Sequence, residues 1–265
     1  MIKDITIGQY IPGDSFVHKL DPRTKILISI LFIISLFIVD KFVAYSFVVA
    51  FLLLVIYVAK IPGRYIFKGL KPVFLLIALT GLLNLFMVRG GDLIFELGFI
   101  KIYELGLRTA VFMAVRLILL IMGTSILTLT TSPIELTDGI EKLLKPIGKE
   151  IAHELAMMMT IALRFIPTLM DETDKIMKAQ KARGADFESG SLIQKAKNLI
   201  PLLIPLFISS FKRADELAMA MEARCYRGGA GRTRMKVLKY TYRDTIAYIV
   251  FATLIGCILA TRFLL

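Results

Sequence analysis

The sequence predicts an all-α, polytopic membrane protein with about five transmembrane helices and long amphipathic helices on the cytoplasmic side. Hydrophobic residues make up 57% of the 265-residue chain, and the mean hydropathy is +0.73. An ordinary soluble domain is less apolar, whereas a bundle of membrane-spanning helices has this composition. The apolar residues also gather into stretches separated by basic loops, a pattern typical of transmembrane topology.

The basic residues indicate orientation in the membrane rather than a nucleic-acid surface. The net charge is +12, and the lysines and arginines fall in segments that flank the apolar stretches. The positive-inside rule places such segments on the cytoplasmic side. We therefore expect the lipid bilayer, and no nucleic acid, among the partners of this chain.

Residues 1–131 predict a membrane domain with four spans. One helix through residues 26–59 would be about 50 Å long, whereas the hydrocarbon core is about 30 Å thick. The break at Asp40-Lys41 is therefore predicted to be a turn between two spans. A basic loop at 60–71 precedes the third span, and a mixed loop at 89–106 precedes the fourth. The four predicted spans are residues 26–39, 42–59, 72–88 and 107–129.

Residues 132–243 predict a cytoplasmic region of amphipathic helices. Ser132 can cap the first helix, Pro133 fits its first position, and Glu135 completes a capping box. The helices are predicted at residues 133–145, 150–184 and 191–225, and residues 244–265 contain the last span. Five spans place the N-terminus and the basic 132–243 region inside the cell and the C-terminus outside.

One motif occurs twice, at the end of each long amphipathic stretch. The matched residues are Asp174, Ala179, Ala182 and Arg183 in the first copy and Asp215, Ala220, Ala223 and Arg224 in the second. The copies finish in the triplets Ala182-Arg183-Gly184 and Ala223-Arg224-Cys225. These six residues are the candidate binding site for a partner with two similar sockets.

The chemistry of the triplets suits docking into a partner. Small neighbours let another surface approach closely, and arginine presents a fixed fork of donors that stays charged. In a groove lined by carboxylate or carbonyl oxygens, each arginine would form charge-assisted bonds worth about 1.5–3 kcal/mol. The alternative is that Arg183 and Arg224 only complement the negative ends of their helices. The duplication of the motif favours paired docking.

The sequence contains no motif for catalysis or cofactor binding. It has no G-x-x-x-x-G-K-[ST] phosphate loop and no paired His or Cys ligand set, so we expect neither an enzyme nor a metal site. Acidic residues in mid-span, which would mark an ion path, are absent, and Arg116 is interpreted as structural. A self-contained secondary transporter or channel is the alternative function. A third is a membrane-bound enzyme or regulator whose basic helices hold anionic lipid or nucleic acid.

Taken together, the motifs resemble the transmembrane T subunit of energy-coupling factor (ECF) transporters. The resemblance covers nearly the whole chain. Besides the two triplets, its motifs are Leu20-Asp-Pro-Arg-Thr-Lys25, Thr131-Ser-Pro-Ile-Glu135, Arg164-Phe-Ile-Pro167 and Ala223-Arg-Cys-Tyr-Arg-Gly-Gly229. One position departs from the family, because Cys225 stands where glycine is usual. A backbone with positive φ would suit cysteine poorly.

The resemblance implies a coupling role in an ABC-type importer. In that family the T subunit joins two cytoplasmic ATPases to a membrane-embedded S subunit that binds a vitamin or other micronutrient. It implies that Arg183 and Arg224 dock one in each ATPase and that the long helices are coupling helices. It further implies that ATP and Mg are bound by the ATPases and not by this chain. The location implied is the cell (inner) membrane of a bacterium or archaeon, and the substrate is set by another chain.

Overall fold

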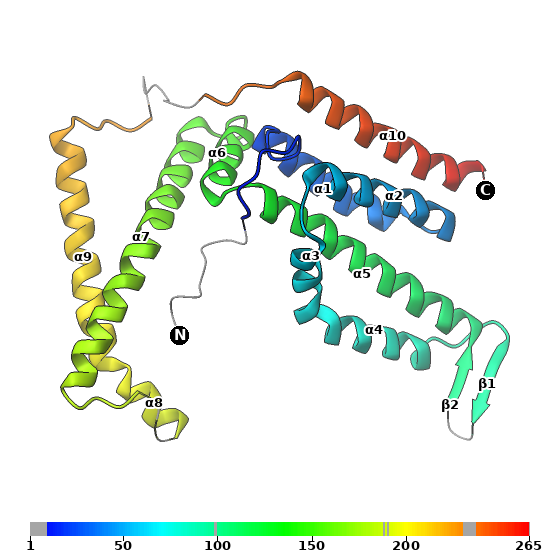
Figure 1. The fold of residues 1–265 in the computed structure, drawn as a ribbon, viewed down its shortest axis with the longest axis horizontal. Helices are drawn as coiled ribbons and strands as arrows, with labels where there is room; N and C mark the ends of the chain where they lie inside the picture. Colours follow the sequence, from blue (N-terminus) through cyan, green and yellow to red (C-terminus); the bar gives the residue numbers. More distant parts are fainter. Residues whose placement is uncertain (1–9, 98–99, 188, 190, 230–236, 265) are drawn as a thin grey trace. The chain divides into compact units, whose positions relative to one another are not determined.

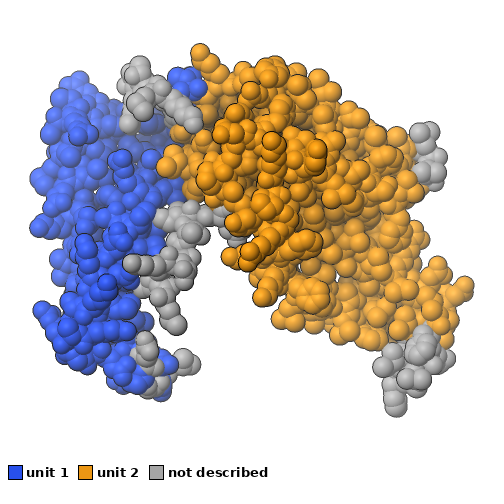
Figure 2. All heavy atoms as spheres, in the orientation of Figure 1, with its two compact units in different colours: residues 1–7, 140–237 blue, residues 8–139, 238–265 orange. Residues whose placement is uncertain are grey.

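The computed structural model describes residues 10–97, 100–187, 189, 191–229 and 237–264. Nearly all of its regular structure is helical (Figure 1), which confirms the all-α class. The chain divides into two compact units, which Figure 2 colours separately. We call residues 8–139 with 238–265 the membrane unit, and residues 1–7 with 140–237 the helix-pair unit.

The membrane unit contains the apolar helices. They are α1 (Pro22–Ile38), α2 (Phe42–Ala59), α3 (Gly63–Leu70), α4 (Phe74–Met87), α5 (Glu104–Thr130) and α10 (Tyr242–Leu264). The first residues of α6 (Pro133–Leu144), which comes after α5 in the chain, also belong to this unit. Within the described residues, four segments are long and apolar enough to cross a membrane: Phe42–Ala59, Gly63–Met87, Glu104–Thr130 and Tyr242–Phe263. The helix α1 has 17 residues and is about 26 Å long, slightly less than the hydrocarbon thickness of about 30 Å. The predicted count of about five is therefore approximate: four clear spans and one shorter apolar helix.

Two segments predicted as loops have regular structure. The basic segment 60–71 contains α3, which a 3₁₀ turn at Lys71–Val73 joins to α4. The mixed segment 89–106 contains an antiparallel hairpin of β1 (Leu93–Leu97) and β2 (Ile100–Tyr103), with Leu97 opposite Ile100. Both loop predictions were wrong. Polar residues and glycines in these segments favoured loops. The β-branched and aromatic residues of 93–103, however, favour strands.

A glycine allows α4 and α5 to pack closely. Gly106 is buried in the first turn of α5, and a Cβ atom there would lie 2.8 Å from the carbonyl oxygen of Val88 and 3.0 Å from that of Leu85. These are backbone atoms at the end of α4, so they cannot rotate away as a side chain can. The close approach of the two helices therefore depends on the absence of a side chain at residue 106.

We expect Gly106→Ala to destabilise the protein by about 1–3 kcal/mol, because overpacking shifts the backbone of α4. The measurement is the melting temperature in detergent. Gly81→Ala is the matched control, since a Cβ at Gly81 in α4 meets no atom within 4 Å. Equal melting temperatures for the two variants would contradict the packing role of Gly106.

The helix-pair unit is built on two long antiparallel helices, α7 (Lys149–Ala182) and α9 (Ile200–Ala223). Three contacts define their direction. Glu172 pairs with Arg213 at 3.3 Å, Gln180 donates to the carbonyl of Pro201 at 3.3 Å, and the ring of His153 lies against Gly229. Residues late in α7 thus contact residues early in α9, and residues early in α7 contact the segment after α9, so the two helices are antiparallel. Figure 1 shows the two helices side by side.

The predicted helix at 191–225 is divided in the structure. The short helix α8 (Leu192–Asn198) ends before Leu199, and α9 begins at Ile200. Pro201 lies in the first turn of α9 and has no N–H to donate to the carbonyl of Lys197, as a continuous helix would require. The proline therefore separates the two helices.

Candidate functional site

The two arginine triplets end their helices with the same backbone geometry. Arg183 is the C-cap of α7, with φ −87° and ψ 6°, and Arg224 is the C-cap of α9, with φ −92° and ψ 15°. The next residue is left-handed in both cases: φ is +87° at Gly184 and +54° at Cys225. The sequence repeat therefore corresponds to a repeat in backbone conformation.

Paired hydrogen bonds close both helix ends. At the first end, Gly184 N–H donates to Lys181 O and Ala185 N–H to Gln180 O, each at 3.0 Å. At the second, Cys225 N–H donates to Glu222 O at 2.8 Å and Tyr226 N–H to Met221 O at 3.0 Å. Both are Schellman motifs, which satisfy the last carbonyls of a helix. Arg183 and Arg224 therefore leave their helices in the same local direction.

The side chains of both triplets are available to a partner. All six predicted site residues are exposed: Ala182, Arg183, Gly184, Ala223, Arg224 and Cys225. Within the described residues, neither arginine guanidinium has a hydrogen bond or an ion pair. Each guanidinium therefore keeps its full set of donors for a partner.

The antiparallel pairing of α7 and α9 separates the two triplets. Because Gln180 contacts Pro201, the first triplet lies beside the beginning of α9, whereas the second lies at its end. The helix α9 has 24 residues and is about 36 Å long, so the arginines are separated by roughly that distance. The triplets thus form two distinct sites and not one cluster, which the sequence repeat alone did not reveal.

Cys225 adopts the conformation that glycine usually supplies. A non-glycine residue in the left-handed region costs about 1 kcal/mol. A Cβ at Gly184 meets no atom within 4 Å, so backbone conformation alone distinguishes cysteine from glycine at the two helix ends. The second triplet therefore keeps its geometry at a small energetic cost.

We expect an exchange of these two residues to act in opposite directions. Cys225→Gly should stabilise the helix-pair unit by about 1 kcal/mol, and Gly184→Cys should destabilise it by at least that amount. Thermal unfolding of the full chain in detergent measures both. A lower melting temperature for Cys225→Gly would show that the cysteine side chain contributes more than its strained backbone costs.

The segment that follows the second triplet is anchored on α7. A Cβ at Gly229 would lie 2.6 Å from Cδ2 of His153, so only glycine permits this contact. His153 Nδ1 lies 3.4 Å from Oε1 of Glu141, whose side chain is buried. Glu141, His153 and Gly229 therefore connect α6, α7 and the segment after α9. The sequence had shown only an isolated histidine.

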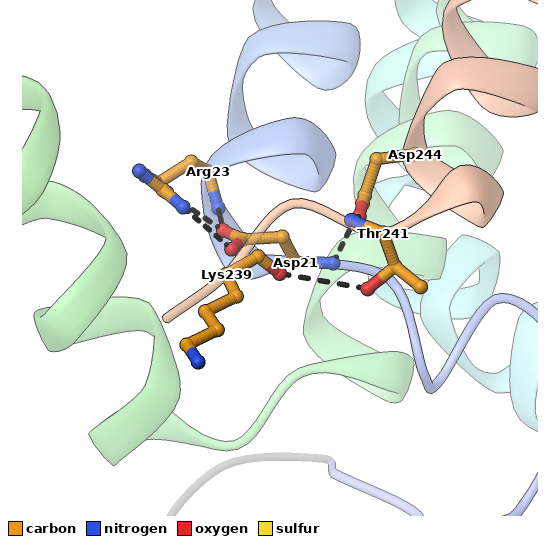
Figure 3. A network of polar contacts seen from close by, with 5 residues as sticks. All are labelled: Asp21, Arg23, Lys239, Thr241 and Asp244. Atoms are coloured by element: carbon orange, nitrogen blue, oxygen red, sulfur yellow. Dashed lines mark hydrogen bonds and ion pairs between the residues drawn. The ribbon is translucent and has the colours of Figure 1, made fainter. Parts of the chain in front are cut away.

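A separate polar cluster in the membrane unit joins the N-terminal segment to the last helix (Figure 3). The Asp244 carboxylate accepts hydrogen bonds from Asp21 N–H at 2.8 Å and from Thr241 N–H at 2.7 Å. Arg23 donates two bonds to Asp21, at 3.0 and 2.8 Å, and its guanidinium lies 3.9 Å from the ring centre of Tyr240. Burial raises the pKa of Asp21, but the hydrogen bonds and charge of Arg23 outweigh it and lower the pKa overall.

This cluster explains part of a motif that the sequence had shown without a role. Asp21 and Arg23 belong to the segment Leu20–Lys25, and Asp244, which accepts the hydrogen bond from Asp21 N–H, lies in the first turn of α10. Thr241 and Asp244 stand three residues apart at the start of an apolar stretch, which is the capping-box spacing. That signal could have identified Asp244 from the sequence.

Lys25 is buried at the start of α1, just before the predicted span 26–39. Its Nζ donates to His18 O at 3.0 Å and to Thr130 O at 2.9 Å. Burial lowers the pKa of Lys25 to about 8, from 10.5 in the unfolded chain. Between pH 8 and 10.5 the unfolded chain therefore binds more protons at this position, so stability rises with pH in that window and is constant below it.

We expect this rise to amount to about 3 kcal/mol. The measurement is the difference in unfolding free energy between the wild type and Lys25→Met from pH 7 to pH 11. Taking the difference removes the contributions of other lysines and tyrosines. A difference that stays flat over this range would contradict the lowered pKa.

Arg116 has the structural role that the sequence suggested. Its Nε donates to the hydroxyl of Tyr45 at 3.2 Å, and its Nη2 donates to the carbonyl of Val39 at 2.9 Å. These partners lie on α2 and in the turn between α1 and α2. Within the described residues, no group of three or more His, Cys, Asp or Glu side chains could hold a metal.

The apolar spans define a multi-pass helical membrane protein, and two of its helices end in exposed arginine-bearing C-caps. The sequence pattern of the cobalt transport protein family, CbiQ, matches residues 13–237. The energy-coupling factor transporter transmembrane protein EcfT of Clostridium kluyveri is 70% identical over 250 residues, covering 93% of each chain. The EcfT proteins of Thermosediminibacter oceani and Bacillus subtilis are 57% and 49% identical, over 99% and 96% of this chain and 100% and 98% of their own.

The chain therefore belongs to the EcfT family of energy-coupling factor transporter transmembrane proteins. The family suggested by the sequence motifs is confirmed. These relatives are named as membrane components of a transporter, which fits a chain that is not itself an enzyme.

Proposed function

We propose that this chain is the non-catalytic coupling subunit of an ATP-driven ECF importer for a vitamin or other micronutrient. The observation that carries the proposal is the pair of arginines, Arg183 and Arg224, which cap two helices that both end in a Schellman motif and which have no partner in the described part of the chain. Two similar and separate arginine-bearing helix ends, which we call tips, suit two similar binding grooves, or sockets, on a partner. We assign each tip to one of two ABC-type ATPase subunits, which form a homodimer or heterodimer.

Arginine is suited to such a socket for physical reasons. Its guanidinium forms several charge-assisted bonds with carboxylate or carbonyl oxygens, and it does not lose its charge. Ala182 and Gly184 around the first tip, and Ala223 and Cys225 around the second, offer little steric hindrance. ATP and Mg are bound by the ATPases in this proposal, and the chain itself binds no cofactor and no nucleic acid.

An apolar stripe on α9 supports an S-subunit contact. Its members are large and exposed, and they follow the helical pattern i, i+3, i+4, i+7, i+8 and i+11: Ile200, Leu203, Ile204, Phe207, Ile208 and Phe211. That spacing places them on one face of the helix. Exposed apolar patches of this kind mark binding surfaces for proteins or membranes. We assign the stripe to the membrane-embedded S subunit.

The arrangement suggests how ATP hydrolysis acts on the S subunit. The stripe occupies the first half of α9, and Arg224 caps the end of the same helix. A helix transmits displacement along its axis because its backbone hydrogen bonds resist bending. Movement of an ATPase socket at Arg224 would therefore shift the stripe and the S subunit with it.

The proposed location is the cell (inner) membrane of a bacterium or archaeon. The N-terminus and residues 132–243 face the cytoplasm in this proposal, where the ATPases find their ATP. The excess of lysine and arginine in those segments supports this orientation.

Co-purification tests the proposed function. The tagged chain, expressed with its native operon and extracted in mild detergent, is expected to bring two P-loop ATPase chains and one small apolar membrane protein. The chain alone should neither bind nor hydrolyse ATP. If the isolated chain in proteoliposomes instead drives substrate uptake with an ion gradient, it is a self-contained secondary transporter and the proposal is wrong.

A further inference from the structure

The membrane unit contains an apolar cavity that the coupling function does not use. Its volume is about 320 Å³, within the range of small-molecule sites. Residues of α1, α2, α5 and α10 form its walls, together with Phe16, Val17 and Leu20. Leu54 and Val250, which line it, are 52% and 38% exposed, so the cavity is open to the side of the bundle.

The cavity runs along the helices from a polar end. Lys25 lies at the start of α1 and Thr130 at the end of α5, and both line the cavity. Phe32 and Gly123 line it seven residues further along those helices, about 10 Å deeper. The polar end therefore coincides with helix termini, where lipid headgroups meet a transmembrane bundle, and the rest extends along apolar residues.

Among the residues that the structure describes, Lys25 is the one charged residue that lines this cavity, and its side chain is deeply buried. The residue is 6% exposed, and its Nζ bonds to two carbonyl oxygens, of His18 and Thr130. An ammonium has three N–H donors, so one remains without an acceptor among the described residues. Glu135, Asp244 and Asp21 act on Lys25 electrostatically, and the structure shows no ion pair between Lys25 and any of these three carboxylates. The ammonium thus has no counter-ion in contact with it in the described part of the chain, and burial lowers its pKa.

We propose that this cavity holds one acyl chain of an anionic phospholipid whose headgroup phosphate accepts a hydrogen bond from Lys25. The chain enters from the side of the bundle and lies along Phe32 and Gly123. Water does not suit the cavity, because a water molecule needs two to four polar partners and the walls are almost entirely apolar. A lipid supplies both an apolar chain and the missing anion. A zwitterionic phosphatidylcholine fits less well, since its own ammonium competes with Lys25 for the phosphate.

Native mass spectrometry of the full chain in detergent tests this site. The delipidated protein is titrated with dioleoyl phosphatidylglycerol and with dioleoyl phosphatidylcholine. We expect one phosphatidylglycerol per chain, bound about tenfold or more tightly than phosphatidylcholine, as one charge-assisted bond supplies. Ala247→Phe fills the cavity and should remove this binding. Ala252→Phe, an exposed position on the same helix outside the cavity, should change the affinity by no more than about twofold.

Lys25→Met tests the headgroup contact and should bind the two lipids equally. If Lys25→Met does not fold, Ala247→Phe still decides the proposal. Unchanged phosphatidylglycerol binding by Ala247→Phe would overturn it, and so would equal affinity of the wild type for both lipids. Recovery of a bound free fatty acid from the purified chain, with no phospholipid bound, would also overturn the assignment.

Discussion

Replacing both Arg183 and Arg224 by glutamate is expected to release the ATPase subunits and abolish ATP-driven uptake. Each arginine contributes about 1.5–3 kcal/mol of charge-assisted bonding, which corresponds to about 10- to 150-fold in affinity per tip. Glutamate would add repulsion in a socket that selects a cation. The measurement is the amount of ATPase that co-purifies with the tagged chain in mild detergent.

The matched control changes the same charge elsewhere on the same helices. Lys175→Glu with Lys212→Glu alters two exposed cations outside the triplets and should leave the complex intact. The single variants Arg183→Glu and Arg224→Glu should each lose about half of the free energy, since the two tips are far apart and share no partner. Normal assembly and uptake in the double variant would refute the docking role of both arginines.

Phe207→Asp is expected to detach the S subunit while the ATPases remain bound. Phe207 lies in the middle of the apolar stripe on α9 and is 65% exposed. A buried aromatic residue at the centre of an interface is worth about 2 kcal/mol or more, and an unpaired carboxylate there adds a desolvation cost. Comparing the S subunit and the ATPases recovered in one purification measures both contacts.

Phe207→Leu is the control for this change, because it keeps an apolar side chain at the same position. It should retain the S subunit. If Phe207→Asp also retains it, the stripe on α9 is covered by something other than the S subunit. If Phe207→Asp loses the ATPases as well, the helix itself has been disrupted and α9 does not separate the two functions.

The hydropathy of the chain was sufficient to predict the class of the fold. Burial in a bilayer demands long apolar helices, and this demand acts on each stretch of sequence by itself. The segments Lys60–Lys71 and Arg89–Gly106 were harder to predict, because short polar stretches near a membrane have no comparable constraint. The helix α3 and the β-hairpin at 93–103 therefore appeared only in the structure.

The candidate site, too, was predictable from the sequence only in part. Local sequence was enough to select the two triplets, since a small residue, an arginine and a helix end are all neighbours in the chain. The left-handed conformation of Cys225 was not predictable, because cysteine rarely adopts it. The hydrogen bond between Asp21 N–H and Asp244 was not predictable either, because the two residues lie near opposite ends of the chain.

The amino-acid sequence by itself determined that the protein is a helical membrane protein of this family, and it identified Arg183 and Arg224 as the candidate docking residues. Only the tertiary structure decided that the two arginines lie at opposite ends of an antiparallel helix pair and that Lys25 lines an apolar cavity. The physical reason is the range of the interactions. Helix ends and apolar spans depend on neighbouring residues, whereas helix pairing and cavities depend on contacts between segments far apart in the chain.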